Sequence, residues 1–264
     1  MTARELLDLG TRRLRDAGVE NARREVEWIA GHVLGLSRSG LYANPDRALS
    51  AAEAERVEAL LIRREAREPL AYVLGEWGFR RLILKTDARA LVPRPETEVV
   101  VERALALLGG IERPRVLDVG VGSGAIALSL KDERPDARVT GVDISADALA
   151  LARENAERLG LDIELREQGV AAAAEGWDLV VSNPPYVETL DGLQPELGYE
   201  PEQALVGEGF HASIARAAKT GFLVLEVGDG QAAGVEHVLE LAGYGDVRIT
   251  RDLAGLERVV EGAR

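Results

Sequence analysis

The sequence predicts an α/β protein whose sheet is mostly parallel and is covered by helices on both faces. From residue 115 onward, short apolar runs alternate with segments of helical apolar spacing, which is typical of such a sheet. Residues 1–74 show only helical spacing, and this indicates a small all-α domain before the sheet. Residues 75–95 hold two short apolar runs that predict a β-hairpin linker, so the larger α/β domain is expected at 96–264.

Helical patterns account for most of the N-terminal domain. Apolar side chains recur at intervals of three and four over residues 2–17 and 21–35. The run Ser50-Ala51-Ala52-Glu53 is a capping box, which predicts a helix from there to about Arg67. Pro69 suits the first turn of a short helix that ends near Leu74.

The expected strands follow in order along the rest of the chain. Trp77-Gly78-Phe79 and Leu82-Ile83-Leu84 form the hairpin. Strands of the main sheet are expected at 115–119, 138–142, 162–166, 178–182, 222–227, 246–250 and 257–261. A short loop with Asp252 and Gly255 joins the last two, which predicts an antiparallel pair. A helix is expected around 212–219, with a tight link at Thr220-Gly221 to the next strand.

A glycine-rich loop follows the first strand of the main sheet. The run Gly120-Val121-Gly122-Ser123-Gly124 lies between that strand and a helical segment, where glycines permit a tight turn and close approach of a ligand. Asp143 ends the next strand, at a position where an acid can bind the two hydroxyls of a ribose. Ser145 can cap the following helix by itself, so Asp143 is expected to be free for a ligand.

Two details favour S-adenosylmethionine over a dinucleotide as the ligand of this loop. The dinucleotide fingerprint needs a third glycine where this chain has Ala125. Asp118 precedes the loop, and an acid there disfavours a pyrophosphate but suits a ligand with a sulfonium and an amino group.

The stretch from Asn183 to Tyr186 is the most informative of the chain. It follows the apolar run 179–181, which predicts a buried strand. Pro184 and Pro185 give a rigid extended exit from this strand, and Asn183 adds a side-chain amide. Tyr186 adds a flat aromatic face. Such a corner can hold a planar NH2 group, with two oxygens accepting its hydrogens and the ring covering its face.

Composition excludes several classes of site. The chain has 264 residues, no cysteine and three histidines that are scattered singly, so thiolate chemistry is excluded and no metal site is expected. Residues 1–70 hold 12 basic and 12 acidic residues, whereas 71–264 hold 20 basic and 33 acidic ones. This acidic balance counts against a nucleic-acid substrate. The absence of a membrane-length apolar run and of a signal-peptide pattern suggests a cytoplasmic protein without a membrane partner.

These motifs together resemble the HemK/PrmC family, protein-(glutamine-N5) methyltransferases that act on peptide chain release factors in translation termination. The resemblance covers essentially the whole chain. It is most specific where the NPPY motif is accompanied by VPRPETE. The matching runs are VPRPETE at 92–98, DVGVGSGAIAL at 118–128, VDIS at 142–145, SNPPYV at 182–187, YEP at 199–201 and EVG at 226–228.

The resemblance implies a Rossmann-like, seven-stranded methyltransferase domain that methylates the glutamine of the Gly-Gly-Gln motif of class 1 release factors. It implies S-adenosyl-L-methionine as donor, S-adenosyl-L-homocysteine as product, and recognition of the release factor by the N-terminal domain. The segment 120–124 would line the methionine part of the donor, and Asp143 the ribose. Asn183 to Tyr186 would bind the glutamine side chain, with Asn183 also beside the donor.

The resemblance also implies where the adenine lies. Family members usually have Gly-Asp followed by an aromatic residue or leucine after the third strand, against the adenine. This chain has Gln168-Gly169-Val170 there, so Val170 is expected as an apolar wall.

Two other functions remain open at this stage. One is a nucleic-acid amino-group methyltransferase, because such enzymes share NPPY. The other is a non-catalytic homologue that only binds S-adenosylmethionine.

Overall fold

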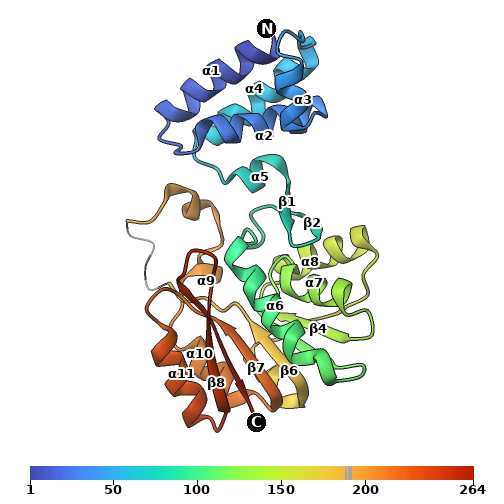
Figure 1. Cartoon of the computed structure of the whole chain (residues 1–264), viewed down its shortest axis with the longest axis vertical. Helices are drawn as coiled ribbons and strands as arrows, with labels where there is room; N and C mark the ends of the chain where they lie inside the picture. Colours follow the sequence, from blue (N-terminus) through green and yellow to red (C-terminus); the bar gives the residue numbers. More distant parts are fainter. Residues whose placement is uncertain (188, 190–191) are drawn as a thin grey trace. The chain divides into compact units, whose positions relative to one another are not determined.

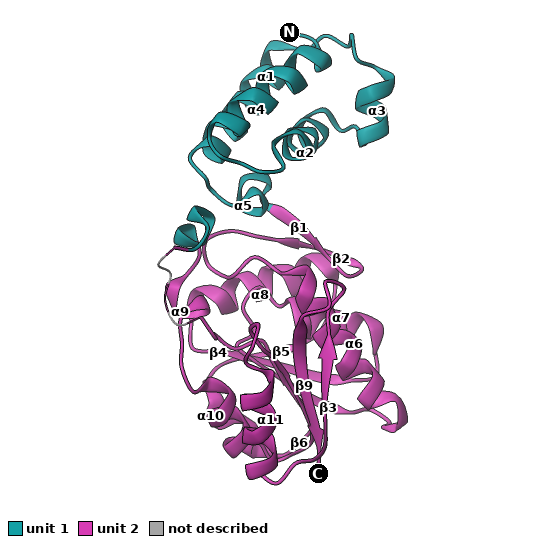
Figure 2. Cartoon of the chain, turned by 60° about the vertical axis from the view of Figure 1, so that its left-hand side comes forward, with its two compact units in different colours: residues 1–75, 193–199 teal, residues 76–192, 200–264 magenta. Residues whose placement is uncertain are grey.

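The computed structural model describes residues 1–187, 189 and 192–264. The chain forms two compact units, shown in separate colours in Figure 2. Unit 1 comprises Met1–Gly75 together with Leu193–Tyr199, and unit 2 comprises Glu76–Gly192 and Glu200–Arg264. This division differs from the predicted one in two ways. The hairpin belongs to the α/β unit, and a short segment from the middle of the α/β sequence belongs to the helical unit.

Unit 1 is built from helices that bury their apolar faces against one another. Thr2 and Ser50 each form a capping box with the glutamate three residues later, so these two helices start where the sequence predicts. The short helix α3 was not predicted, and Ser37 caps it. The helices are α1 (Ala3–Asp16), α2 (Ala22–Leu34), α3 (Arg38–Ala43), α4 (Ala51–Glu65), α5 (Leu70–Leu74) and the 3₁₀ turn η4 (Pro195–Tyr199).

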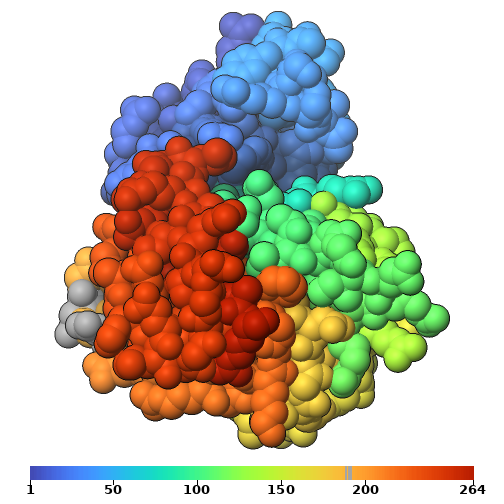
Figure 3. Space-filling view, turned by 60° about the horizontal axis from the view of Figure 1, so that its bottom comes forward, coloured from blue at the N-terminus to red at the C-terminus, as the bar shows by residue number. Residues whose placement is uncertain are grey.

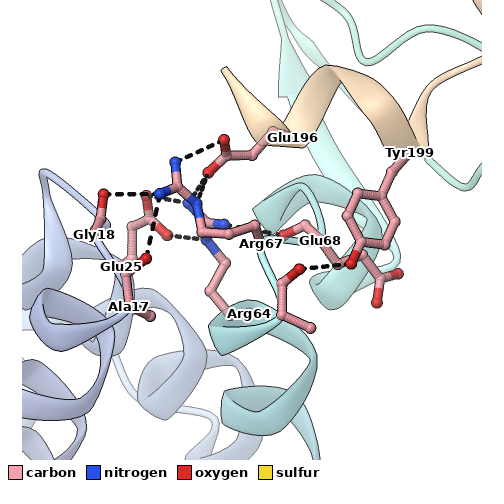
Figure 4. Close-up of polar contacts among 9 residues, drawn as sticks. Ala17, Gly18, Glu25, Arg64, Arg67, Glu68, Glu196 and Tyr199 are labelled. Carbon is pink, nitrogen blue, oxygen red and sulfur yellow. Dashed lines mark hydrogen bonds and ion pairs between the residues drawn. The ribbon is translucent and has the colours of Figure 1, made fainter. Parts of the chain in front are cut away.

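An arginine clamp holds η4 within unit 1 (Figure 4). The Arg64 guanidinium is almost fully buried and lies 2.5 Å from Glu25 Oε2 and 2.8 Å from Glu196 Oε1. Arg67 contacts both oxygens of Glu196 at 2.8 Å. The Tyr199 hydroxyl donates to the Ala66 carbonyl at 2.5 Å. The 3₁₀ turn η4 is therefore fixed to helix α4 and its C-terminal turn.

Unit 2 contains a main sheet in the order β5-β4-β3-β6-β7-β9-β8, seven strands among the described residues. The first five strands of this order run parallel. Strand β9 pairs antiparallel with β8, as predicted, and also with β7, which was not predicted. The strands are β3 (Arg115–Val119), β4 (Arg138–Asp143), β5 (Glu164–Glu167), β6 (Trp177–Ser182), β7 (Thr220–Glu226), β8 (Gly245–Arg251) and β9 (Glu257–Ala263).

Helices cover both faces of this sheet (Figure 1). Along β6, Leu179 and Val181 join the core under α6 (Glu98–Leu107), α7 (Ala125–Glu133) and α8 (Ala146–Leu159). Val180 joins the core on the other face, under α10 (Phe210–Ala217) and α11 (Ala232–Leu241). This alternation is the period of two that strands impose. The remaining elements of unit 2 are β1 (Glu76–Phe79), β2 (Leu82–Lys85), η1 (Pro95–Thr97), α6 (Glu98–Leu107), η2 (Leu108–Gly110), α7 (Ala125–Glu133), α8 (Ala146–Leu159), η3 (Val170–Glu175), α9 (Glu202–Leu205), α10 (Phe210–Ala217) and α11 (Ala232–Leu241).

Long-range polar contacts tie the outer elements to the sheet. Asn155 of α8 is fully buried, accepts from Lys85 N at 2.7 Å and donates to the carbonyls of Lys85 and Ser123. It thereby joins the hairpin to the glycine loop. Arg103 of α6 forms an ion pair with Glu261 of β9 at 2.6 Å. In Figure 3, the green α6 region and the red C-terminal strands lie on the same surface.

The predicted link at Thr220-Gly221 is wrong. Both residues belong to β7, where Thr220 pairs with Trp177 and the Gly221 carbonyl accepts from Arg264 N. The preceding helix, α10, lies two residues earlier than predicted, and the link is instead Ala218-Lys219.

Among the described residues, no helix is long and apolar enough to cross a membrane.

Candidate active site

A cavity in unit 2 opens where the strand order reverses. Strands β3 and β6 are neighbours, but the chain continues from β3 to β4 on one side and from β6 to β7 on the other. Open α/β sheets bind ligands at the carboxyl ends of the strands at such a point. The glycine loop follows β3 here, and Asn183 follows β6. Both line the cavity, so the structure brings together the two motifs that the sequence singled out.

The glycine loop turns back on itself through residues with positive φ. Gly120, Gly122 and Gly124 have φ values of +76°, +53° and +89°. A Cβ on Gly124 would lie 2.8 Å from Leu128 Cδ1, so glycine is also required there for packing. The loop is anchored by Gly120 N and Val121 N, which both donate to the Val142 carbonyl. Residues 120–123 line the cavity, whereas Gly124 supports them from the start of α7.

Asp143 lines the cavity and also binds the protein. Its Oδ2 accepts from Gly122 N at 3.0 Å, and its Oδ1 accepts from Ser145 N at 2.9 Å. The expectation that Asp143 is free for a ligand was therefore wrong in part, although Ser145 does cap α8 through Ala148 N. Each carboxylate oxygen can accept more than one hydrogen bond, so acceptor capacity remains on the cavity side.

Asp118 lies beneath the loop and is not among the described residues that line the cavity. The side chain is buried, and Oδ2 accepts from Ala127 N at 3.1 Å at the start of α7. Oδ1 is buried without a hydrogen-bond partner among the described residues. Burial, and next the charge of Asp143, raise the pKa of Asp118 to about 7. The structure thus gives Asp118 a role in supporting the loop.

The NPPY corner enters the cavity from the other side. Asn183, Pro184 and Pro185 all line it. Asn183 Nδ2 donates to Thr97 Oγ1 at 3.2 Å, which turns the amide nitrogen toward η1. The Ser182 hydroxyl, at the end of β6, donates to the Val119 carbonyl at 2.6 Å. This hydrogen bond joins the end of β6 to the end of β3.

Tyr186 lies behind the corner and is not among the described residues that line the cavity. Its hydroxyl donates to Glu226 Oε1 at 3.1 Å, and its carbonyl accepts from Gln231 Nε2 at 3.0 Å. Gln231 Oε1 in turn accepts from Gly228 N. Burial is the main reason that the pKa of Tyr186 is raised, so the phenol stays protonated.

The sequence analysis did not identify Glu200, which positions part of the cavity wall without lining the cavity itself. Glu200 is buried, accepts from Val92 N at 2.9 Å and pairs with Arg94 at 2.5 Å. It thereby fixes the 92–94 segment, which lines the cavity. The YEP run, which contains Glu200, was the available signal, but it gave no hint of the residue's partners.

The remaining wall is apolar. Val170, at the start of η3, lines the cavity beside Ile144. Among the described residues, no group of three or more His, Asp or Glu side chains is placed to hold a metal ion.

Comparisons with known proteins agree with this architecture. The PrmC N-terminal domain model matches residues 5–75, and the methyltransferase small domain model matches residues 97–210. A release factor glutamine methyltransferase from Rhodospirillum rubrum is 42% identical, with coverage of 96% of this chain and 82% of that protein. The chain belongs to the release factor glutamine methyltransferase family. A second member, from Geobacter sulfurreducens, is also 42% identical, with 99% and 96% of the two chains covered.

Solved structures show the same fold for this family member. The T. thermophilus 16S rRNA N2 G1207 methyltransferase, in complex with AdoMet and guanosine, superimposes with a TM-score of 0.52 at 19% identity, covering 72% of this chain and 49% of that one. The hMettl16 catalytic domain superimposes with a TM-score of 0.53 at 15% identity, covering 81% of this chain and 82% of that one. At these identities the likeness establishes the fold alone.

Proposed function

We propose that the protein transfers a methyl group from S-adenosylmethionine to the side-chain amide nitrogen of the glutamine in the Gly-Gly-Gln motif of class 1 release factors. The observation that carries the proposal is the shared cavity. The NPPY corner after β6 and the glycine loop after β3 open into the same space in a chain of this family. An amide held by the corner would therefore face a donor held by the loop.

The lining of the cavity fits the donor. The glycine loop has no Cβ atoms at Gly120 and Gly122, which leaves its backbone open to the methionine part. Asp143 offers carboxylate oxygens for ribose hydroxyls. Val170 and Ile144 supply apolar surface for the adenine. When bound, S-adenosylmethionine supplies an activated sulfonium methyl and leaves as S-adenosyl-L-homocysteine.

The NPPY corner holds and orients the amide nitrogen of the substrate. Amide nitrogen is a weak nucleophile because its lone pair is delocalised into the carbonyl. Asn183 Oδ1 and the Pro184 carbonyl would accept hydrogen bonds from the two N–H groups, which would orient the nitrogen toward the methyl group of a bound donor. These acceptors also stabilise the positive charge that grows on nitrogen during transfer. Tyr186 supports the corner, and the methylated amide loses its proton to solvent.

Charge supports a protein substrate over a nucleic acid. Residues 71–264, which contain the whole of unit 2 and two short segments of unit 1, carry 33 acidic and 20 basic side chains. Such a unit repels a polyphosphate backbone. The family members named above are release factor glutamine methyltransferases, which also disfavours the nucleic-acid alternative.

Mass spectrometry of a purified class 1 release factor tests the proposal. The factor is incubated with the protein and S-adenosylmethionine, and a second factor carries alanine in place of the Gly-Gly-Gln glutamine. We expect one methyl group on that glutamine and none on the alanine variant. Donor binding by calorimetry without any methyl transfer would contradict the proposal and favour a non-catalytic homologue.

A further inference from the structure

We propose that Gln168, directly after β5, recognises the edge of the donor's adenine and so determines the base specificity of the cavity. This inference deepens the proposed function and rests on it, since it takes S-adenosylmethionine as the donor. The apolar wall of Val170 and Ile144 leaves this task open. Apolar contacts alone discriminate weakly between flat rings of the same size, so a polar group is needed to select adenine.

The position of Gln168 in the sheet places it beside the ribose site. Asp143 at the end of β4 pairs in register with Glu167 of β5, and Gln168 N donates to the Asp143 carbonyl at 3.1 Å. The methionine part of the donor extends from the ribose toward the glycine loop and the NPPY corner. The base, which is bonded to the other side of the ribose, would therefore extend toward the 168–170 turn.

The surface for the face of the base lies next to this turn. A Cβ on Gly169 would lie 3.4 Å from Ile144 Cγ2, so the turn and the isoleucine side chain lie close together. Ile144 lines the cavity and is 65% exposed. Covering this side chain with a flat ring removes apolar surface from water, which favours binding. A ring that rests on Ile144 would have Gln168, another lining residue, within reach of its edge.

The side-chain amide of Gln168 is available for a ligand. The residue is exposed, and its amide forms no hydrogen bond with the residues that the structure describes. Neighbouring polar side chains at this end of the cavity are already engaged. Asp143 accepts from two backbone N–H groups, and the Ser145 hydroxyl caps α8.

A carboxamide matches adenine in the polarity of its hydrogen bonds. The N6 amino group of adenine donates, and the ring nitrogens on either side of it, N1 and N7, accept. The planar amide of Gln168 offers Oε1 as an acceptor and Nε2 as a donor, so it can pair with the amino group and a ring nitrogen together. A carboxylate would accept from N6 but would set a second lone pair against the ring nitrogen.

Calorimetry with two ligands tests the proposal. One is S-adenosyl-L-homocysteine, and the other is its analogue with hydrogen in place of the adenine amino group. Neither ligand carries a methyl group to transfer, so the measurement does not depend on methylation. We expect the wild type to bind the analogue about five- to tenfold more weakly, because one hydrogen bond is lost.

Substitution of Gln168 should remove this preference. Gln168→Met keeps the length of the side chain but has no amide, so S-adenosyl-L-homocysteine should bind on the order of tenfold more weakly. The two ligands should then bind this variant equally, within about twofold. Gln168→Glu keeps an acceptor and loses the donor. It should bind S-adenosyl-L-homocysteine more weakly than the wild type and still prefer it to the analogue.

Two other glutamines serve as comparisons. Gln203 of α9 also lines the cavity, and it extends to a second cavity beside Asp147. Gln203→Met should keep the preference for the amino group. Gln194→Met, at an exposed glutamine of unit 1, is the matched control and should leave both affinities unchanged.

The outcomes separate this inference from the proposed function. Equal wild-type affinity for the two ligands would overturn it, since no group then recognises the amino group. A preference that survives in Gln168→Met would also overturn it, and its loss in Gln203→Met would move base recognition to α9. If the wild type binds S-adenosyl-L-homocysteine with this preference but methylates no release factor, the proposed function falls and the role of Gln168 stands. If the wild type does not bind S-adenosyl-L-homocysteine, both fall.

Discussion

Asn183 is the side chain whose loss tests the amide site most directly. We expect Asn183→Ala to lower kcat on the order of 10²-fold, since an oriented acceptor for developing charge contributes about 3 kcal/mol. Donor affinity should be retained, because the glycine loop and Asp143 are untouched. The measurement is single-turnover methylation with donor calorimetry. Asn44→Ala, on the surface of unit 1, is the control, and unchanged turnover in Asn183→Ala would remove the residue from the mechanism.

Because the carboxyl of Asp118 is buried, we expect the free energies of unfolding of the wild type and of an Asp118→Asn variant to differ with a sign that depends on pH. Its folded pKa of about 7 lies above the ordinary 3.8, so ionisation destabilises the fold. This cost is absent below about pH 4 and complete above about pH 7, where it is about 4 kcal/mol. Asp118→Asn removes the charge but buries an NH2 without an acceptor, at about 1–3 kcal/mol.

The Asp118→Asn variant should therefore be more stable than wild type at about pH 8.5 and less stable at about pH 4. Urea unfolding at the two pH values measures both free energies. The same sign at both values would mean that the carboxyl does not titrate near neutrality in the folded state.

At the residue scale, the sequence indicated the motifs but not their partners. Asn183 to Tyr186 and the 120–124 loop were singled out because each is contiguous and has a distinctive pattern of prolines or glycines. Of these, residues 183–185 and 120–123 line the cavity, whereas Tyr186 and Gly124 do not. Thr97 and Glu226 lie in the VPRPETE and EVG runs, so their segments were noticed. Their contacts with Asn183 and Tyr186 join positions far apart in sequence, and such contacts depend on the packing of the whole sheet.

At the scale of elements, the clamp on η4 predicts a local effect on chain dynamics. Glu196→Gln weakens the contacts to Arg64 and Arg67, while Arg64 keeps Glu25 and Arg67 keeps backbone carbonyls. We expect faster amide exchange in residues 193–199 and a loss of global stability of only about 1–2 kcal/mol. Hydrogen-exchange mass spectrometry measures the first. Glu20→Gln is the surface control, and unchanged protection of 193–199 would show that the ion pairs do not hold the segment.

Elements with strong local signals were confirmed, and weakly patterned ones were not. The apolar runs 115–119, 138–142 and 178–182 agree with β3, β4 and β6 within one residue at either end. Strand β5 begins two residues later and ends one residue later than predicted, since its sequence ELRE has no apolar run. The membership of η4 in unit 1 could not be predicted, because it depends on pairing Glu196 with arginines of another part of the chain.

At the scale of the whole molecule, net charge separates the proposed function from its nucleic-acid alternative. The chain carries a formal charge of −13, all of it from residues 71–264. A protein that binds a nucleic acid releases counterions, and the logarithm of its affinity falls by about 0.9 for each phosphate contact per unit of log salt. A unit with a strong excess of acidic side chains repels the phosphates, so we expect it to bind such a chain weakly.

We therefore expect RNA and duplex DNA to bind more weakly than about 10⁻⁴ M at about 0.15 M salt, with a slope smaller in magnitude than about 1. Fluorescence anisotropy with labelled oligonucleotides over a salt series measures both quantities, with a class 1 release factor titrated under the same conditions for comparison. A slope of several units would reveal a phosphate-binding surface on this acidic chain. Because a steep slope requires several cations to displace counterions at once, that result would favour an amino group of a nucleic acid as the substrate of the NPPY corner.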